Sequence, residues 1–459
     1  MKRLLALLLA AACAASLLGC AASDPSGSVT LPDSVAELAA PEAVSMANYP
    51  REDDYYDAKT GEWDDDAWDR DYTAWRADYD AKTADLQSVD DYAAYFQSGI
   101  RTLLSGAGAE NRVCSPLNVY LALAMLAEVT DGNSRAQILS TLGADSIESL
   151  RTKAAALWNE NSWDDGQVKS LLANSLWLRD GDSYTTDTLS RLANDYHAAA
   201  FSGEMGSDDY NKALQAWINE NTGNLLTEQA SGLSLDPETV LALVSTIYFS
   251  ASWTDQFQKS ATSEQTFHAP AGDVTCDFLH SSETGTVYSG DGFTAIRLGL
   301  QGSGAMWLLK PDEGVSPEDL LSSEDAMSFL TANGSWSQTQ YAEIHLSLPK
   351  FDVASDLDLT GSLAALGITD VFDASAADFS PLKPDASDLA LTQAKHAARV
   401  KIDEDGCEAA AYTVLAVSET AAIVDPSIVE FTLDEPFLFT ITGLDGLPLF
   451  AGIVNQPNS

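Results

Sequence analysis

The fold of this 459-residue chain is decided by the stretch EDGCEAAAYT at residues 404–413. It follows residues 398–402, whose alternating apolar side chains predict a β-strand, and it precedes a loop of small and apolar residues that ends at Pro426. One glycine and a cluster of tiny side chains provide little to anchor the segment and little to obstruct it. The stretch therefore predicts a loop that can bend and slide into a sheet as an added strand.

Upstream of this stretch, the chain predicts helices first and strands later. A Ser-Pro pair opens an apolar helical run over residues 115–126, since proline is favoured in the first turn of a helix. Residues 241–249 carry no charge, and their β-branched and aromatic side chains favour a buried strand over a buried helix. Two apolar runs, 293–300 and 305–309, flank a Gly-Ser-Gly turn and predict a hairpin. This order predicts the α+β class, in which helices pack on large sheets.

The N-terminus predicts export. Lys2 and Arg3 precede an apolar run over residues 4–18, which is typical of a signal peptide and too short for a membrane-spanning helix. The Leu-Leu-Gly-Cys sequence that ends at Cys20 resembles the lipobox of bacterial lipoproteins. That resemblance implies cleavage before Cys20, a lipid on its thiol, and an exported protein anchored at the bacterial cell surface. A secreted protein without the lipid is the alternative.

The formal net charge of −45 restricts the possible partners. Such a chain repels nucleic acid, heparin-like polyanions and anionic membrane surfaces, and it favours cationic partners. Beyond the signal peptide and Cys20, the cysteines Cys114, Cys276 and Cys407 show no paired spacing. We therefore predict no disulfide framework, no metal site and no cofactor.

The composition divides the chain into three parts: a signal peptide at 1–19, an acidic, aromatic-containing tether or stalk at 20–88, and a globular domain at 89–459. The first half of the stalk is rich in Ala, Ser, Pro and Asp, which is typical of a flexible tether. The second half combines many carboxylates with Trp63, Trp68 and Trp75. Either these aromatics pack on the main body, or they form an acidic, aromatic patch that binds a basic partner.

Seven short blocks lie in order along the globular part, from Val89 to about Pro457. They are CSPL at 114–117, WIN at 217–219, IYF at 247–249, LPKF at 348–351, LGITDVF at 366–372, GCEAAA at 406–411 and PFLF at 436–439. As an ordered set at these spacings, they resemble the serpins along the whole length of this part, although no single block carries the resemblance. The resemblance implies three β-sheets, eight to nine helices and an exposed reactive loop, in an inhibitor that is not an enzyme and has no catalytic residues.

The resemblance also implies a mechanism. A serine protease attacks the reactive loop as a substrate, and after acylation the hinge of the loop enters the main sheet, which displaces and distorts the protease. Cys407 departs from the usual Thr or Ser of the family and is expected to expose an oxidisable thiol. Tyr412 is bulkier than usual and would slow insertion if it faced the sheet interior. The implied hinge residues are Glu404, Gly406, Cys407, Glu408, Ala409, Ala410 and Ala411.

Family spacing from Glu404 implies that the protease cuts the bond between Thr420 and Ala421. Counting back from Pro436 implies a later bond, near Asp425. We favour the first because the length of the inserted segment must match the sheet, whereas extra residues beyond the cut are tolerated.

The residues around this bond indicate the target. Thr420 lies among small side chains and suits a shallow specificity pocket, so elastase-like serine proteases are the expected partners. If Glu419 were the acyl residue, a glutamate-preferring protease would be indicated instead. No basic residue follows Lys401, which disfavours trypsin-like targets.

Two supporting clusters follow from the resemblance. Lys350 matches the lysine that pairs with the hinge glutamate, and His396 matches a histidine near Ser115. Ser245 stands where the family has an Asn that bonds this histidine, so the network around it is expected to differ. The breach, where insertion starts, comprises Trp253, Thr262, Lys350 and Glu404, and the shutter comprises Ser115, Pro116, Ser245 and His396.

Two alternatives stay open at this point. The same fold could inhibit cysteine proteases, or a non-inhibitory serpin could act as a surface binding protein through its acidic stalk. The small hinge side chains argue against the second alternative. In the favoured interpretation the protein is a monomer that binds extracellular serine proteases and contacts the membrane only through the lipid on Cys20.

Overall fold

The computed structural model describes residues 31–57, 59–84, 86, 89–385, 389–407 and 427–457, all within one compact unit. The α+β class predicted from the sequence is confirmed, with twelve α-helices among the described residues. The helices are α2 (Glu52–Tyr55), α3 (Asp65–Thr83), α4 (Ala93–Leu104), α5 (Pro116–Val129), α6 (Gly132–Thr141), α7 (Ile147–Asn161), α8 (Thr186–Asp195), α9 (Asp208–Glu220), α10 (Thr227–Ser231), α11 (Pro317–Ser322), α12 (Glu324–Leu330) and α13 (Thr360–Ala365).

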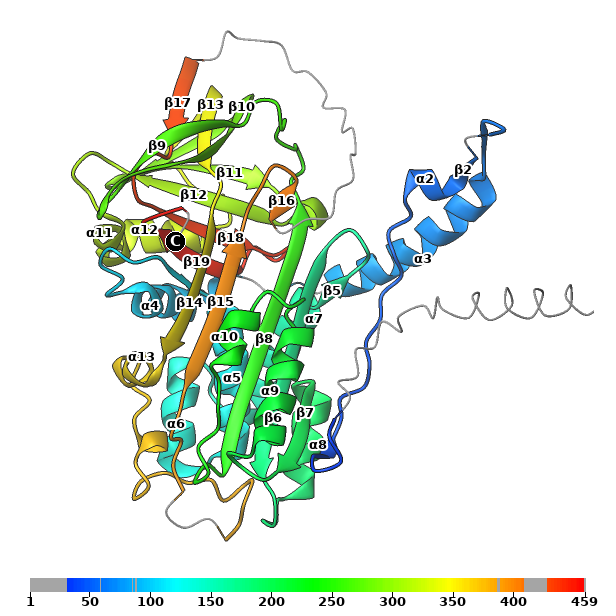
Figure 1. The fold of residues 1–459 in the computed structure, drawn as a ribbon, viewed down its shortest axis with the longest axis vertical. Helices are drawn as coiled ribbons and strands as arrows, with labels where there is room; N and C mark the ends of the chain where they lie inside the picture. The colour runs from blue at the N-terminus through cyan, green and yellow to red at the C-terminus, as the bar shows by residue number, and fades with distance from the viewer. Residues whose placement is uncertain are drawn as a thin grey trace, which may run out of the picture. The chain divides into compact units, whose positions relative to one another are not determined.

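A six-stranded sheet, here called the main sheet, positions the site described below (Figure 1). Its order is β1-β7-β6-β8-β16, with β5 added beside β6. The charge-free run at 241–249 forms part of β8, as predicted, and β8 pairs antiparallel with β6 from Lys169 opposite Ser250 to Leu178 opposite Leu241. The strands are β1 (Ala36–Ala39), β5 (Trp163–Asp164), β6 (Lys169–Arg179), β7 (Ala198–Gly203), β8 (Leu241–Ser252) and β16 (Gly406–Cys407).

A nine-stranded sheet has the order β17-β13-β10-β11-β12-β18-β19-β4, with β9 beside β10. The predicted hairpin is present as β11 and β12. Separate two-stranded sheets are formed by β14 with β15 and by β2 with β3. These strands are β2 (Tyr56–Asp57), β3 (Glu62–Trp63), β4 (Arg112–Cys114), β9 (Ser263–Ala269), β10 (Gly272–Gly290), β11 (Phe293–Gly299), β12 (Ala305–Pro311), β13 (Thr339–Pro349), β14 (Asp352–Asp358), β15 (Lys395–Lys401), β17 (Ser427–Thr432), β18 (Phe437–Thr442) and β19 (Pro448–Val454).

Helix α5 lies at the centre of the core, where it contacts both β8 and β19. Its start follows from the sequence, because Ser115 caps the helix by accepting a hydrogen bond from the Asn118 amide at 3.2 Å and Pro116 occupies the first turn. The rest of the helix is apolar on almost every side and is buried accordingly.

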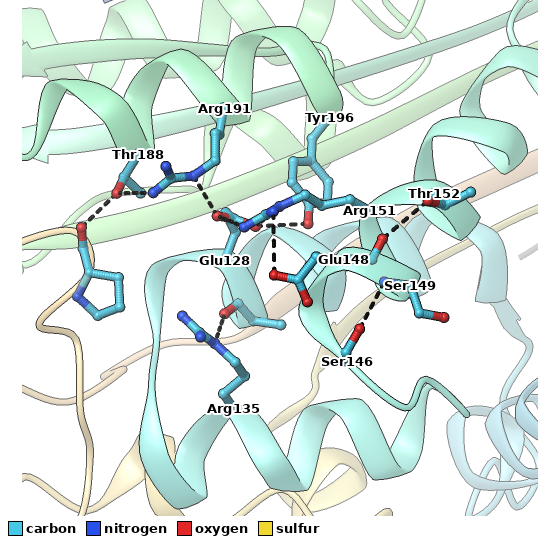
Figure 2. A network of polar contacts seen from close by, with 12 residues as sticks. Glu128, Arg135, Ser146, Glu148, Ser149, Arg151, Thr152, Thr188, Arg191 and Tyr196 are labelled. Atoms are coloured by element: carbon cyan, nitrogen blue, oxygen red, sulfur yellow. Dashed lines mark hydrogen bonds and ion pairs between the residues drawn. The ribbon is translucent and has the colours of Figure 1, made fainter.

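One carboxylate, Glu128, is buried near the end of α5 and is held by a polar network (Figure 2). Arg151 of α7 donates two hydrogen bonds to it, at 2.8 and 2.9 Å, and Arg191 of α8 donates a third at 2.9 Å. The Tyr196 hydroxyl donates a fourth at 3.2 Å. A buried carboxylate is stable only when its oxygens are satisfied in this way, so Glu128 ties three helices together.

The segment before residue 89 also contacts the sheets. Strand β1 pairs antiparallel with β7, with Ala36 opposite Ser202, and thereby forms one edge of the main sheet. The division of the chain at residue 88 stays a prediction. Among the helices of the described residues, none combines the length and the apolar character that crossing a membrane requires.

We predict that Glu128→Gln lowers the free energy of unfolding by about 2 kcal/mol, because the neutral amide loses charge-assisted hydrogen bonds from two arginines. Glu148→Gln is the matched control, since Glu148 is exposed and lies 4.0 Å from the same Arg151. Guanidinium unfolding at pH 7 should show a lower midpoint only for the first variant. Equal midpoints for the two variants would contradict the role assigned to the network.

Candidate hinge and strand-insertion site

The chain reverses direction just after β15, in a tight turn over residues 403–406. The Asp403 carboxylate accepts hydrogen bonds from the amides of Asp405 at 3.0 Å and Gly406 at 3.3 Å, and the Asp403 amide donates to the Gly406 carbonyl at 3.0 Å. Aspartate favours such turns because its side chain can bond to the backbone two or three residues on. We did not single out Asp403 from the sequence, although an Asp that precedes a glycine by three residues was a usable signal.

Glu404 is anchored at this turn although it is only 8% exposed. Lys350 donates to its two oxygens at 2.9 and 3.2 Å, and Thr262 donates at 2.8 Å. Burial tends to raise the pKa of the Glu404 carboxyl, but the hydrogen bonds from Lys350 and Thr262 outweigh burial, so the pKa is lowered. The structure therefore brings together three of the four residues expected at the breach.

The fourth breach residue, Trp253, holds the backbone of the same turn. Its indole Nε1 donates to the Asp403 carbonyl at 2.8 Å, and its amide donates to the Asp405 carbonyl at 3.1 Å. Lys259 adds an ion pair with the Asp405 carboxylate at 2.9 Å. Sequence reasoning missed Lys259, because nothing in a single chain links residues so far apart.

The reversal directs the hinge into the main sheet. Gly406 and Cys407 form β16, which pairs antiparallel with Ser252 and Ala251 at the end of β8 (Figure 1). On its other side Cys407 bridges to Ile402, which directly follows β15. Gly406 and Cys407 therefore already lie beside β8, and Cys407 lies between β8 and the residue that follows β15.

Position 406 requires glycine because the backbone of β8 lies too close to leave room for a side chain. A Cβ atom at this position would lie 2.4 Å from the Ala251 carbonyl oxygen and 2.7 Å from the Ser252 Cα, far inside van der Waals contact. Cys407 is 3% exposed, so the expectation of an exposed thiol was wrong. The reason is that strand pairing with β8 turns this side chain into the core.

Beyond β16, the described residues show no hydrogen-bonded pairing between β8 and β15. A cavity of about 340 Å³ lies there instead. Its walls include Ser245 and Thr246 from β8, His396 from β15, and Leu214 and Ile218 from α9. The position next to β8 is thus filled by a strand at one end and open toward a cavity further along.

The shutter residues meet beside this cavity. The Ser115 amide donates to Nε2 of His396 at 2.9 Å, which requires Nε2 to carry no proton. Burial lowers the pKa of His396 to about 4, so the ring is neutral at pH 7. Pro116 contributes its carbonyl, which accepts from the Tyr95 hydroxyl at 3.0 Å.

Ser245 does not take the place of an Asn beside His396. Its hydroxyl bonds to the Asn118 side chain, and Asn118 in turn donates to the Ser245 carbonyl at 2.8 Å. The link from β8 therefore runs to α5, and Asn118 is a member of the cluster that sequence reasoning missed.

Several predicted site residues lie outside the described part of the chain. They are Cys20, Glu408, Ala409, Ala410, Ala411, Thr420 and Ala421. Within the described part, no group of three or more His, Cys, Asp or Glu side chains could hold a metal ion.

The main sheet therefore already includes two residues of the adjoining hinge. A family model described as Serpin (serine protease inhibitor) matches residues 98–457. The chain belongs to the serpin family, as the sequence blocks indicated. The family is described by its protease inhibitors, and its members are not enzymes.

Known relatives agree with this assignment. The leukocyte elastase inhibitor of Homo sapiens is 28% identical over 359 residues, which cover 76% of this chain and 94% of that protein. Serpin-Z2B of Triticum aestivum is 29% identical over 369 residues, or 76% of this chain and 90% of the relative. The crystal structure of tengpin, a thermophilic serpin, in its native state has a TM-score of 0.70 at 25% identity and covers 80% of this chain and 94% of its own.

We predict that Gly406→Ala breaks the pairing of β16 with β8, because the added Cβ would overlap the Ala251 carbonyl. The thermal midpoint of the intact protein should fall by about 2–4 °C. Gly361→Ala is the control, since a Cβ there meets nothing within 4 Å. An unchanged midpoint for Gly406→Ala would mean that the pairing is absent in solution.

We also predict a pH dependence of stability from His396. Unfolded histidine titrates near pH 6.5, whereas folded His396 titrates near 4, so between these values only the unfolded state binds the proton. The free energy of unfolding should therefore fall as the pH drops from 6.5 to 4, by up to about 3 kcal/mol from this residue.

The variant His396→Gln keeps an acceptor for the Ser115 amide but does not titrate. Unfolding midpoints of wild type and variant should converge as the pH is lowered from 7 to 4.5, since only the wild type loses the histidine contribution. A constant difference between the two across this range would refute the predicted linkage.

Proposed function

We propose that this serpin inhibits extracellular serine proteases irreversibly, by cleavage of its reactive loop and insertion of the hinge into the main sheet. The observation that carries the proposal is the pairing of Gly406 and Cys407 with β8, at the entrance to a strand position that ends in a cavity. Because these two residues already pair with β8, the residues that follow them can extend the same strand once the loop is cut.

The proposed chemistry begins as ordinary proteolysis. The catalytic serine oxygen of the protease attacks the Thr420 carbonyl, the bond to Ala421 breaks, and Ala421 leaves as a free amine. Thr420 remains as an ester on the protease. Insertion of the freed hinge beside β8 then adds main-chain hydrogen bonds to the sheet and moves the protease away before water can cleave the ester.

The observed register predicts how the hinge residues would face after insertion. Cys407 lies opposite Ala251 and belongs to the core together with Phe249 and Ile247 on the same face of β8. Because side chains alternate along a strand, Ala409 would face this core opposite Phe249. Glu408 and Ala410 would point to the other face.

The same alternation predicts whether Tyr412 would face the interior of the sheet after insertion. Continued register would place it opposite Thr246, on the face away from the core. Thr246 lines the cavity of about 340 Å³ beneath α9, so the ring of Tyr412 would enter this space. We therefore infer that Tyr412 is compatible with efficient insertion.

The target class that we propose is elastase-like. Thr420 and its small neighbours suit a shallow pocket, and one matched relative is named as an inhibitor of leukocyte elastase. The absence of Lys and Arg from the sequence after Lys401 supports the same choice. We further propose that the lipobox-like sequence anchors the protein at a bacterial cell surface through a lipid on Cys20, where it would act as a monomer.

We predict that the protein forms a covalent complex with a pancreatic-type elastase, stable on a denaturing gel, and releases a peptide that begins at Ala421. Ala409→Glu should abolish the complex and leave only cleaved inhibitor, because insertion would bury a carboxylate opposite Phe249 at a cost of several kcal/mol. Ala410→Glu carries the same change on the opposite face and should retain most of the complex.

Each result of this experiment bears on a separate claim. Clean cleavage of the wild type without any complex would exclude inhibition by insertion. Equal losses for the two glutamate variants would show that the register is wrong. A complex with a papain-type protease, and none with elastase, would favour the cysteine-protease alternative.

A further inference from the structure

A row of aromatic rings follows one face of helix α3. Trp68, Tyr72, Trp75 and Tyr79 recur every three or four residues, and neighbouring ring centroids lie 5.2–6.2 Å apart. Trp63 of the β2–β3 hairpin extends the row, with its centroid 5.3 Å from Trp68. This segment lies outside residues 98–457, which the family model matches.

The inner end of the row is fixed to the rest of the domain. Tyr79 meets Trp163 edge to face at 5.7 Å, and Nε1 of Trp75 donates to the Asp165 carboxylate at 3.0 Å. Lys82 donates to two backbone carbonyls at the end of α7, at 2.9 and 2.8 Å. The sequence left two alternatives for these aromatic side chains, namely packing on the main body or binding a basic partner. At this end of the row, the side chains pack on the main body.

The outer end of the row remains exposed. Tyr56 is 52% exposed, Trp63 37% and Tyr72 36%, and α3 contains no buried residue. Leaving large aromatic side chains in water is unfavourable, and tryptophan and tyrosine are enriched where proteins bind partners. The outer end is therefore an unpartnered face among the described residues.

The charge around this face is strongly negative. Residues 51–84 contain twelve carboxylates and five cationic side chains. Arg70 and Arg76 pair with neighbouring aspartates at 2.8 Å, and Arg51 and Lys82 donate to backbone carbonyls. Glu62, Asp65 and Asp66 line a hollow beside Trp63 and Tyr56, and no ion pair within the described residues engages them.

We propose that this face, the aromatic–acidic surface formed by Tyr56, Trp63, Tyr72, Glu62, Asp65 and Asp66, docks a lysine- or arginine-rich polypeptide segment. Aromatic faces attract cations, and carboxylates beside them add a Coulombic contribution. The chain already shows this contact internally, since the Arg76 guanidinium lies 5.0 Å from the centroid of the Tyr79 ring.

Charge complementarity favours a basic polypeptide segment over other partners. A second copy of the chain, or any acidic partner, would bring like charges together, because the net charge is −45. An apolar partner would bury three carboxylates without counter-charges, which is costly. A basic segment satisfies both the rings and the carboxylates.

The test uses the full chain and a twelve-residue peptide of alternating Lys and Gly, with binding followed by tryptophan fluorescence at low ionic strength. We expect saturable binding that weakens as salt is added. The triple variant Glu62→Gln, Asp65→Asn, Asp66→Asn should bind about tenfold more weakly. Trp63→Leu, which keeps the apolar contact but removes the aromatic face, should bind about threefold more weakly.

The triple variant Glu238→Gln, Asp312→Asn, Glu313→Gln is the matched control, because it also removes three exposed carboxylates and they lie outside the aromatic–acidic surface. It should leave the affinity unchanged, and circular dichroism should show that all variants fold. If the control weakened peptide binding as much as the variant of the aromatic–acidic surface, the effect would depend on net charge alone, and the proposal would be overturned. Undiminished binding by Trp63→Leu, or equal binding of a Glu-Gly peptide, would also overturn it. None of these outcomes depends on protease inhibition.

Discussion

The ion pair between Glu404 and Lys350 is the interaction on which the functional part of the structure depends. It fixes the point at which the chain leaves β15 and turns back, and it does so with a carboxylate that is almost fully buried. A buried charge tolerates little displacement, because any movement would leave it without its partner. Hydrogen bonds that involve Thr262, Trp253 and Asp403 fix the rest of the turn. The turn directs Gly406 along the end of β8.

In this geometry, one side of strand β8 in the main sheet is largely without a paired strand among the described residues. In the described part of the chain, β8 is paired along its length with β6 on one side but meets only two residues of β16 on the other. The β14–β15 pair lies across a cavity instead of completing the sheet. Strand edges that lack full pairing favour the addition of a strand, which is the basis of the proposed insertion. The neutral His396 and its bond to Ser115 lie beside this cavity, where a charge would be costly.

Sequence patterns located most of these elements. The charge-free run of β8, the hairpin of β11 and β12, and the proline-led helix α5 follow from local composition and periodicity, which depend on neighbours along the chain. The pairing of Lys350 with Glu404 was anticipated only through resemblance to a family. The partner of Ser245, the role of Asp403 and the burial of Cys407 were missed, because each depends on side chains that packing brings together from distant parts of the chain.

The sequence by itself determined that a glycine and small side chains follow a predicted strand, which is the pattern from which we predicted a hinge. It also determined the charge of the N-terminal segment and the spacing of its aromatic residues. Only the tertiary structure decided that Gly406 and Cys407 are already paired in the main sheet, and which end of the aromatic row is covered. The physical reason is that strand register and burial arise from contacts between residues far apart in the sequence, as for Gly406 opposite Ser252 and Tyr79 against Trp163, and no local pattern encodes such contacts.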